Sequence, residues 1–116
     1  MSTTYCLVNQ TKREVIWFRH LPASSKREIA GHPAAAAVTA WYMLEHPGDE
    51  IAFVADTGHW PFSSGSPKDL DSYREMTDTV VDALIAAEIL RDEGRQTYLD
   101  DEPDIYCRLL RNIWED

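Results

Sequence analysis

Hydrophobic and β-branched side chains dominate two short segments near the start of the chain, residues 4–9 and 14–19. Such side chains favour the extended backbone of a β-strand. The polar stretch between them, residues 9–13, is short enough for a hairpin loop. The pattern therefore predicts two strands joined by a turn.

The next segment carries the signals of two helices. Ser25 and Glu28 have the spacing of a capping box, in which two side chains satisfy backbone amides at a helix start. Pro33 suits the first position of a second helix, and the Ala-rich residues 34–45 have high helix propensity. We expect this second helix to end at the Pro-Gly pair of residues 47–48.

An apolar run at residues 50–56 is bounded by turn residues, which indicates a buried strand at the centre of a sheet. Residues 57–67 contain two glycines, two prolines and three serines, so we expect a loop. This loop carries Trp60 and Phe62. Large apolar residues on a loop either fold back over the core or stand out as anchors for a partner.

Two further helices are expected in the second half of the chain. Ser66 and Pro67 resemble a helix start, an apolar stripe recurs at helical spacing over residues 70–87, and Gly94 supplies a stop. Residues 101–103 open a last helix, whose apolar positions over residues 105–114 recur as adjacent pairs four residues apart. The expected order of elements is ββαβαα.

This order predicts a single α+β domain over residues 1–116. The N-terminal hairpin and the third strand form a small sheet, covered by the Ala-rich helix, the long helix and the C-terminal helix. With 44% hydrophobic residues, the chain has enough apolar mass for a real core. Its longest nearly apolar stretch, residues 34–44, is about half of the ~20 residues that a membrane span needs.

The chain opens with neither a basic nor an apolar leader pattern, so we expect a cytoplasmic protein. Cys6 and Cys107 are expected to be reduced and to pack in the core. Neither has a close Cys or His neighbour in the sequence, which argues against structural zinc.

Acidic residues dominate the charge, because 20 Asp and Glu against 11 Lys and Arg give a net −9. This balance argues against direct nucleic-acid binding, which needs positive charge against phosphates. Residues 1–48 carry five basic and three acidic residues, a net +2, whereas residues 49–116 carry six and 17, a net −11. Such acidity either keeps a small protein soluble or docks it on a basic partner.

No complete catalytic signature is present, so we expect a protein that is not an enzyme. Asp56 and His59 follow the third strand and could serve as an acid–base pair or as two metal ligands. Asp at a strand end is more simply a turn residue. Cys6 or Cys107 would act as a nucleophile only if a His approached it in space.

Two phrases resemble a group of small bacterial proteins. Residues 5–14 (YCLVNQTKRE) are similar to a YxLVNxTKKE hairpin, and residues 47–56 (PGDEIAFVAD) to a GDxIxFVxD strand. Those proteins are similar in size and acidity to immunity proteins that neutralise polymorphic toxins. The resemblance implies a bacterial cytosolic protein with the order hairpin, helix, strand, helix, and it brings no catalytic residue. This chain has an Ala-rich helix where the group often has a Gly-rich insertion.

Our first hypothesis is an immunity protein that neutralises a cognate bacterial toxin by direct binding through its acidic half and the Trp60 loop. The alternatives are a small enzyme or ligand-binding domain with a pocket at the end of the third strand, and an acidic mimic of nucleic acid. We expect no membrane partner, no metal and no cofactor. The residues expected to contact the partner are Asp56, His59, Trp60, Phe62, Asp71, Glu75, Asp78 and Asp82.

Overall fold

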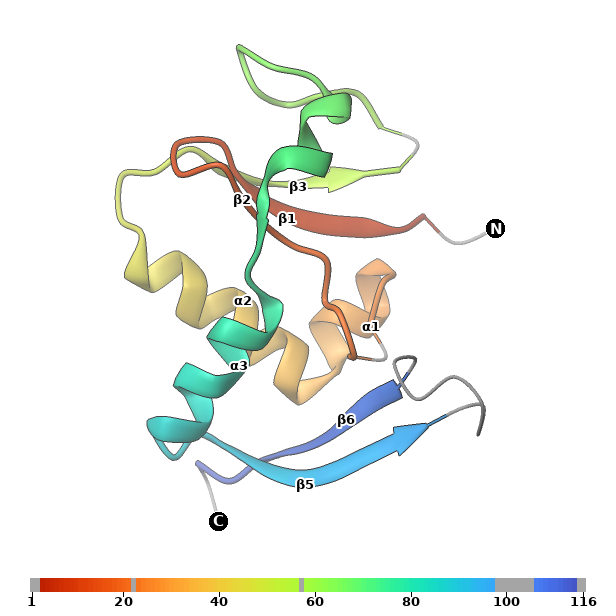
Figure 1. Cartoon of the computed structure of the whole chain (residues 1–116), viewed down its shortest axis with the longest axis vertical. Coiled ribbons are helices and arrows are strands. Elements are labelled where there is room, and N and C mark those ends of the chain that lie inside the picture. The colour runs from red at the N-terminus through yellow and green to blue at the C-terminus, as the bar shows by residue number, and fades with distance from the viewer. Residues whose placement is uncertain (1–2, 22, 57, 98–105, 115–116) are drawn as a thin grey trace.

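The computed structural model describes residues 3–21, 23–56, 58–97 and 106–114. Within them the chain forms a four-stranded sheet, helices packed on that sheet, and a separate two-stranded hairpin (Figure 1). The predicted α+β class is therefore confirmed.

The four-stranded sheet is built around the first strand. Strand β1 (Tyr5–Asn9) pairs antiparallel with β2 (Glu14–Ile16) on one side and with β3 (Ile51–Ala55) on the other. The short strand β4 (Arg74–Glu75) runs parallel to β2, which gives the order β3-β1-β2-β4. The strand expected over residues 50–56 is thus present, but it lies at the edge of the sheet and β1 takes the centre.

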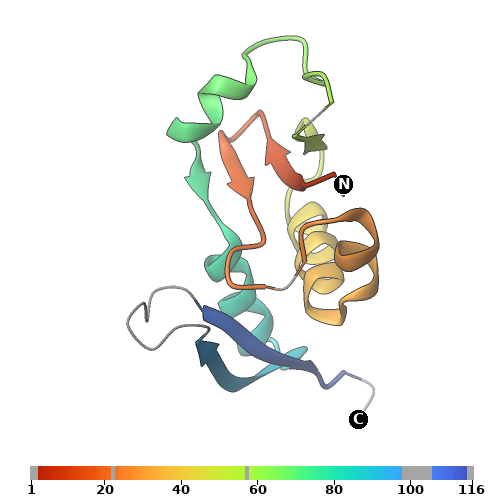
Figure 2. The ribbon, with the colours of Figure 1, turned by 90° about the vertical axis from the view of Figure 1, so that its right-hand side faces the viewer.

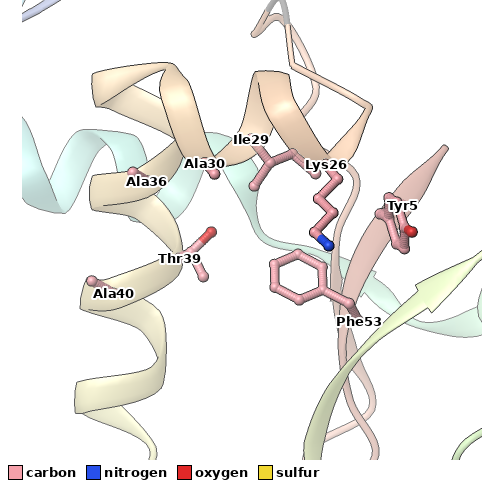
Figure 3. A pocket seen from close by; sticks show the side chains of 8 residues that line it. All are labelled: Tyr5, Lys26, Ile29, Ala30, Ala36, Thr39, Ala40 and Phe53. Atoms are coloured by element: carbon pink, nitrogen blue, oxygen red, sulfur yellow. The ribbon is translucent and has the colours of Figure 1, made fainter. Parts of the chain in front are cut away.

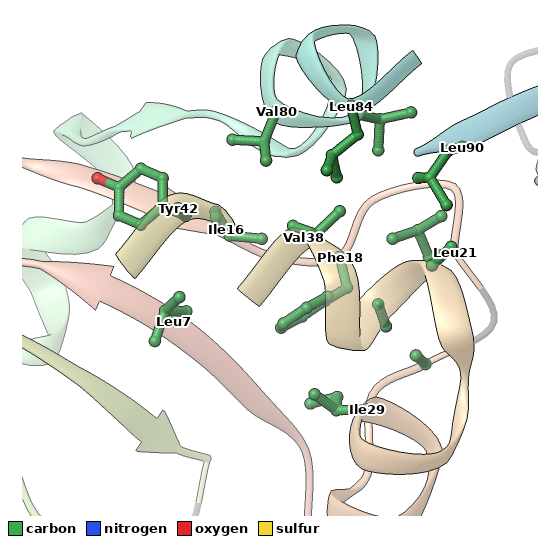
Figure 4. Packing of buried hydrophobic residues seen from close by; sticks show 14 residues of the cluster. Leu7, Ile16, Phe18, Leu21, Ile29, Val38, Tyr42, Val80, Leu84 and Leu90 are labelled. Atoms are coloured by element: carbon green, nitrogen blue, oxygen red, sulfur yellow. The ribbon is translucent and has the colours of Figure 1, made fainter. Parts of the chain in front are cut away.

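Alternate side chains of these strands enter two different hydrophobic clusters, because successive residues of a strand point to opposite faces. Leu7 and Ile16 belong to a first cluster, on the face that the helices cover (Figure 4). Cys6, Val8 and Val15 belong to a second cluster on the opposite face. The sheet therefore separates two cores.

Helices α1 (Lys26–Gly31) and α2 (Pro33–Glu45) lie on the first face, and both begin where the sequence predicts. The capping box of α1 is formed, with the Ser25 hydroxyl and the Glu28 carboxylate each accepting from the other residue's amide. Helix α2 begins with a different cap, since His32 Nδ1 accepts from the Ala35 amide at 3.2 Å. Among the described residues, no helix combines the length and the hydropathy that crossing a membrane requires.

The second face is covered by the segment that follows β3. Phe62 in the loop and Leu70 in the 3-10 helix η1 (Pro67–Ser72) are both buried in the second cluster. Gln10 ties this loop to the β1–β2 turn, because its amide nitrogen donates to the Ser64 carbonyl at 3.1 Å and its amide oxygen accepts from the Tyr73 hydroxyl.

The prediction of one long helix from residue 70 is wrong. The chain instead forms η1, then β4, then a shorter helix α3 (Thr77–Ala86). The Arg74 amide donates to the Arg13 carbonyl and the Met76 amide to the Val15 carbonyl, so pairing with β2 holds this stretch extended. Gly94 is not a helix stop, since it lies in an irregularity of a strand.

The prediction of a C-terminal helix is also wrong. Strand β6 (Tyr106–Asn112) occupies most of its expected range and pairs antiparallel with β5 (Leu90–Thr97). The Arg108 amide donates to the His20 carbonyl at 2.7 Å, which fixes the hairpin to the body of the protein. The order ββαβαα is thus replaced by β1-β2-α1-α2-β3-η1-β4-α3-β5-β6. Residues 101–105, expected to start the helix, lie outside the described residues.

Gly65 provides a test of how tightly the loop is held. Its φ is +78°, and an added Cβ would lie 2.9 Å from the Gln10 amide nitrogen. Gly65→Ala should cost roughly 2–3 kcal/mol of unfolding free energy, from left-handed backbone strain and lost Gln10 hydrogen bonds. Urea denaturation measures this cost. Gly48→Ala is the control: its φ is +84° with nothing within 4 Å, so it should cost only about 1 kcal/mol. Equal costs would contradict the packing argument.

The His32 cap should make stability depend on pH. Burial lowers the pKa of His32, so the neutral ring that caps α2 is favoured in the fold. Its contribution is present above the ordinary His pKa of about 6.5 and is lost as the pH falls through the lower folded pKa. His32→Asn keeps a cap whose acceptor does not titrate and should flatten this part of the stability curve between about pH 7 and 5. Denaturant melts across this range measure the unfolding free energy of both proteins. If the cap is irrelevant, the free energy of the variant will change with pH as steeply as that of the wild type.

Candidate functional site

The acidic residues expected to form the partner surface have different surroundings in the structure. Asp71 is exposed at the end of η1. Glu75 is instead used within the fold, because its carboxylate accepts from the amides of Trp17 and Thr77 and from the Thr77 hydroxyl. The structure therefore leaves Asp71 open to solvent and gives Glu75 a role in joining β2, β4 and α3.

Asp78 and Asp82 converge on an arginine from the C-terminal hairpin. The Arg108 guanidinium lies 3.1 Å from Asp78, 3.3 Å from Asp82 and 3.3 Å from Asp92, measured between nitrogen and carboxylate oxygen. The Arg108 side chain is only 12% exposed. Helix α3 and the β5–β6 hairpin are therefore joined by one partly buried cation and three more exposed carboxylates.

This cluster is asymmetric in charge. Although burial opposes it, the hydrogen bonds that Arg108 donates to Asp78, Asp82 and Asp92 raise the pKa of Arg108, which stays protonated. The Gly94 amide, and after it Arg108, lowers the pKa of Asp92. Within the cluster three carboxylates face one guanidinium, and strands β5 and β6 also carry Arg91, Arg95 and Arg111. Sequence reasoning missed Arg108 because it placed residues 105–114 on a separate helix.

Trp60 and Phe62 take the folded-back arrangement rather than standing out from the loop. Phe62 is buried in the second cluster and Trp60 packs against that cluster. Their rings meet edge to face with centroids 5.0 Å apart, and the Trp60 ring nitrogen donates to the Ser64 carbonyl at 2.7 Å. In this structure the loop closes the second core.

The residues expected near a pocket at the strand end have separate surroundings in the structure. The Asp56 carboxylate accepts from the Thr4 amide at 3.2 Å, which makes Asp56 part of the β1–β3 junction. His59 is exposed. Within the described part of the chain, no group of three or more His, Cys, Asp or Glu residues could hold a metal ion.

Both cysteines are buried and free, as expected for core residues. Burial raises the pKa of Cys6 to about 11, so its thiol stays protonated at neutral pH. A protonated thiol is a poor nucleophile.

A buried polar network joins the sheet to the end of α2. The Tyr42 hydroxyl donates to the Glu14 carboxylate at 2.6 Å, and the Asn9 amide donates to Asp49 at 2.9 Å. Burial, followed by the Glu14 hydrogen bond, raises the pKa of Tyr42. His46 stacks on Tyr42 and lies 3.7 Å from the Glu14 carboxylate. These groups satisfy one another, and the network joins the helix to the sheet.

A groove of about 500 Å³ lies between the sheet and helices α1 and α2 (Figure 3). Its walls come from both helices and from the two neighbouring strands, and the Phe53 ring and the Lys26 side chain face each other across it. Alanines on α1 and α2 leave the space that larger side chains would fill. The lining residues are Tyr5, Lys26, Ile29, Ala30, Ala36, Thr39, Ala40 and Phe53.

The groove opens beside the outer edge of β3, with which no other strand of the described residues pairs. At the end of this edge the Ala55 carbonyl accepts from the Gly58 amide. Figure 2 shows β3 as the last strand on its side of the sheet, in agreement with the strand order. The Asp56 amide bonds to Thr4 and the Gln10 amide to Glu50, so by antiparallel alternation Ile51, Phe53 and Ala55 point their backbone groups away from β1. Phe53 also keeps 39% of its surface exposed. An accessible hydrogen-bonding edge and an apolar groove thus share one residue.

Comparisons with protein-family models, with curated proteins and with solved structures find no match to this chain. The function of the site is therefore argued from its own residues.

Removing Arg108 should show how much this residue contributes to the unfolding free energy by neutralising the three carboxylates. Arg108→Gln leaves three carboxylates without their cation and should lower the unfolding free energy by about 2 kcal/mol at pH 7. Because the folded pKa of Asp92 is lowered, its contribution is present above about pH 4 and is lost as the pH falls through the folded pKa. Arg108 is one of the groups that lower this pKa, after the Gly94 amide, so part of the variant's deficit should disappear as acid protonates Asp92.

The control for this measurement is Arg91→Gln, which removes an exposed pair with Glu93 at 3.2 Å. Exposed pairs contribute at most about 1 kcal/mol. A similar loss for both variants, or a deficit that does not change with pH, would show that the cluster does not link α3 to the hairpin. Reversing Asp78 or Asp82 to Lys would disturb the same cluster, so Asp71→Lys is the cleaner test of acidic docking.

Proposed function

We propose that this protein is a non-enzymatic protein-binding protein, and that a partner adds an extended segment to the open edge of β3. The observation that carries the proposal is the placement of Phe53. Its backbone lies at the unpaired edge and its ring lines the groove of about 500 Å³.

Strand addition uses both features at once. Main-chain hydrogen bonds to a sheet edge supply affinity, and a pocket for an alternate side chain supplies specificity. On an added strand, the residue opposite Phe53 would project to the same face and reach the groove. The apolar lining would then remove that side chain from water, which favours association.

We further propose that the partner is a basic bacterial toxin and that this chain is its immunity protein. The net charge of −9 would attract a basic protein and speed its encounter. The resemblance of residues 5–14 and 47–56 to small bacterial proteins is in keeping with this role.

A test begins with the protein purified from its native cells and one stoichiometric partner identified by mass spectrometry. The partner is then purified and rebound to the wild type and to Phe53→Lys, which places a charge in the groove. We expect Phe53→Lys to weaken binding at least about tenfold, through the loss of apolar contact at the centre of the interface. It should also lose the ability to neutralise a toxic partner.

The matched control is Leu44→Lys, which makes the same kind of change at a 79% exposed position on α2 that does not line the groove. Thermal melts confirm that both variants fold. Unchanged affinity of Phe53→Lys would contradict the proposed site. An identified partner that is acidic, or that is not inhibited on binding, would contradict the immunity role.

A further inference from the structure

We infer the chemistry of the segment that the edge accepts: an extended stretch with an uncharged, apolar centre and a basic residue at each end. The inference rests on the proposed function, because it names the partner segment for the same edge. It is carried by the residues that flank β3 and by the cation at the groove.

Acidic residues bound the edge strand at both ends. Glu50 precedes β3 and Asp56 follows it, and both are exposed. Among the residues that the structure describes, neither carboxylate takes part in an ion pair. Directly opposed side chains on neighbouring strands lie about 5 Å apart, so opposite charges there stabilise pairing and like charges oppose it. A strand laid along residues 50–56 therefore pairs best with Lys or Arg at its two ends.

At the centre of the edge an apolar residue is favoured over a basic one. The residue opposite Phe53 enters a groove whose lining is mainly apolar, and the Lys26 side chain lies across that groove from Phe53 (Figure 3). Among the described residues, Lys26 has no acidic partner within ion-pair distance. A cationic side chain at the centre would meet this ammonium and lose its water, whereas an apolar one fills the space.

The same charges disfavour a second copy of this chain as the occupant. Two β3 strands paired antiparallel about Phe53 would place Glu50 of one opposite Asp56 of the other. Parallel pairing in register would place each carboxylate opposite its own counterpart. Either arrangement sets like charges against each other at both ends, a known way of protecting sheet edges from self-association. The edge therefore selects a basic foreign strand.

Two short peptides test this pattern on the full-length protein. Both are blocked seven-residue peptides with a leucine at the centre, KTVLVTK and its charge-reversed counterpart ETVLVTE, each carrying fluorescein for anisotropy titrations. The basic peptide should bind at least about fivefold more tightly in low salt, and the difference should shrink in 0.5 M NaCl. Amide NMR signals of Ile51 and Phe53 should shift with the bound peptide.

Charge-reversed protein variants make the test specific to the edge. The double variant Glu50→Lys with Asp56→Lys should reverse the preference, so that ETVLVTE binds more tightly. The double variant Asp71→Lys with Glu88→Lys makes the same change in net charge at exposed positions away from β3, and it should keep the preference for KTVLVTK. A reversal in both variants would mean that net charge decides binding, and would overturn the inference.

The outcomes separate the inference from the proposed function. Shifts at Ile51 and Phe53 with equal affinity for the two peptides would overturn the charge pattern and leave strand addition standing. No shift at these amides with either peptide would overturn both the inference and the proposed edge. If the edge variant fails to fold, the wild-type comparison of the two peptides at low and high salt still decides the charge pattern.

Discussion

The structure depends on the double pairing of β1. This strand hydrogen-bonds to β2 on one side and to β3 on the other, and its alternate side chains enter the two hydrophobic clusters. The helices pack on one face through Leu7 and its neighbours, whereas the loop and η1 close the other face over Cys6 and Val8. Because β1 takes the centre, β3 is left at the edge, and the proposed binding site is a consequence of this order.

The first half of the fold could be predicted from the sequence because its signals are local. A capping box, a proline at the first helical turn and short β-rich segments act within a few residues, and β1, β2, α1, α2 and β3 follow them. The second half could not, because distant contacts decide it. The apolar stripe at residues 70–87 fits a helix. However, the Arg74 amide bonds to the turn before β2 and the Met76 amide bonds to β2 itself, and these bonds hold residues 74–76 extended. The bond from Arg108 to His20 acts in the same way on the last segment.

The candidate site was predictable only in part. The alternative in which Trp60 and Phe62 fold back over the core is the one found, whereas the binding role suggested by acidity and size stays a prediction. The groove was not predictable, because the alanines of α2 signal helix propensity in the sequence and only the packed helix turns their small size into empty space. The role of Phe53 was hidden for a similar reason. A phenylalanine in an apolar run indicates a core residue, and edge position depends on which strand β1 joins.

The separation of two cores by one sheet has a consequence for motion. Exchange of the β1 amides with solvent requires the strand to leave both neighbours and both clusters, so these amides are expected to exchange only in global unfolding. The β5–β6 hairpin is different, since almost all of β5 beyond Leu90 is exposed. The hairpin joins the body through Leu90 in the first cluster, the Arg108 cluster and a few backbone bonds. Its exposed amides are expected to exchange faster than those of β1. The proposed binding edge therefore belongs to the part of the protein that is expected to exchange most slowly.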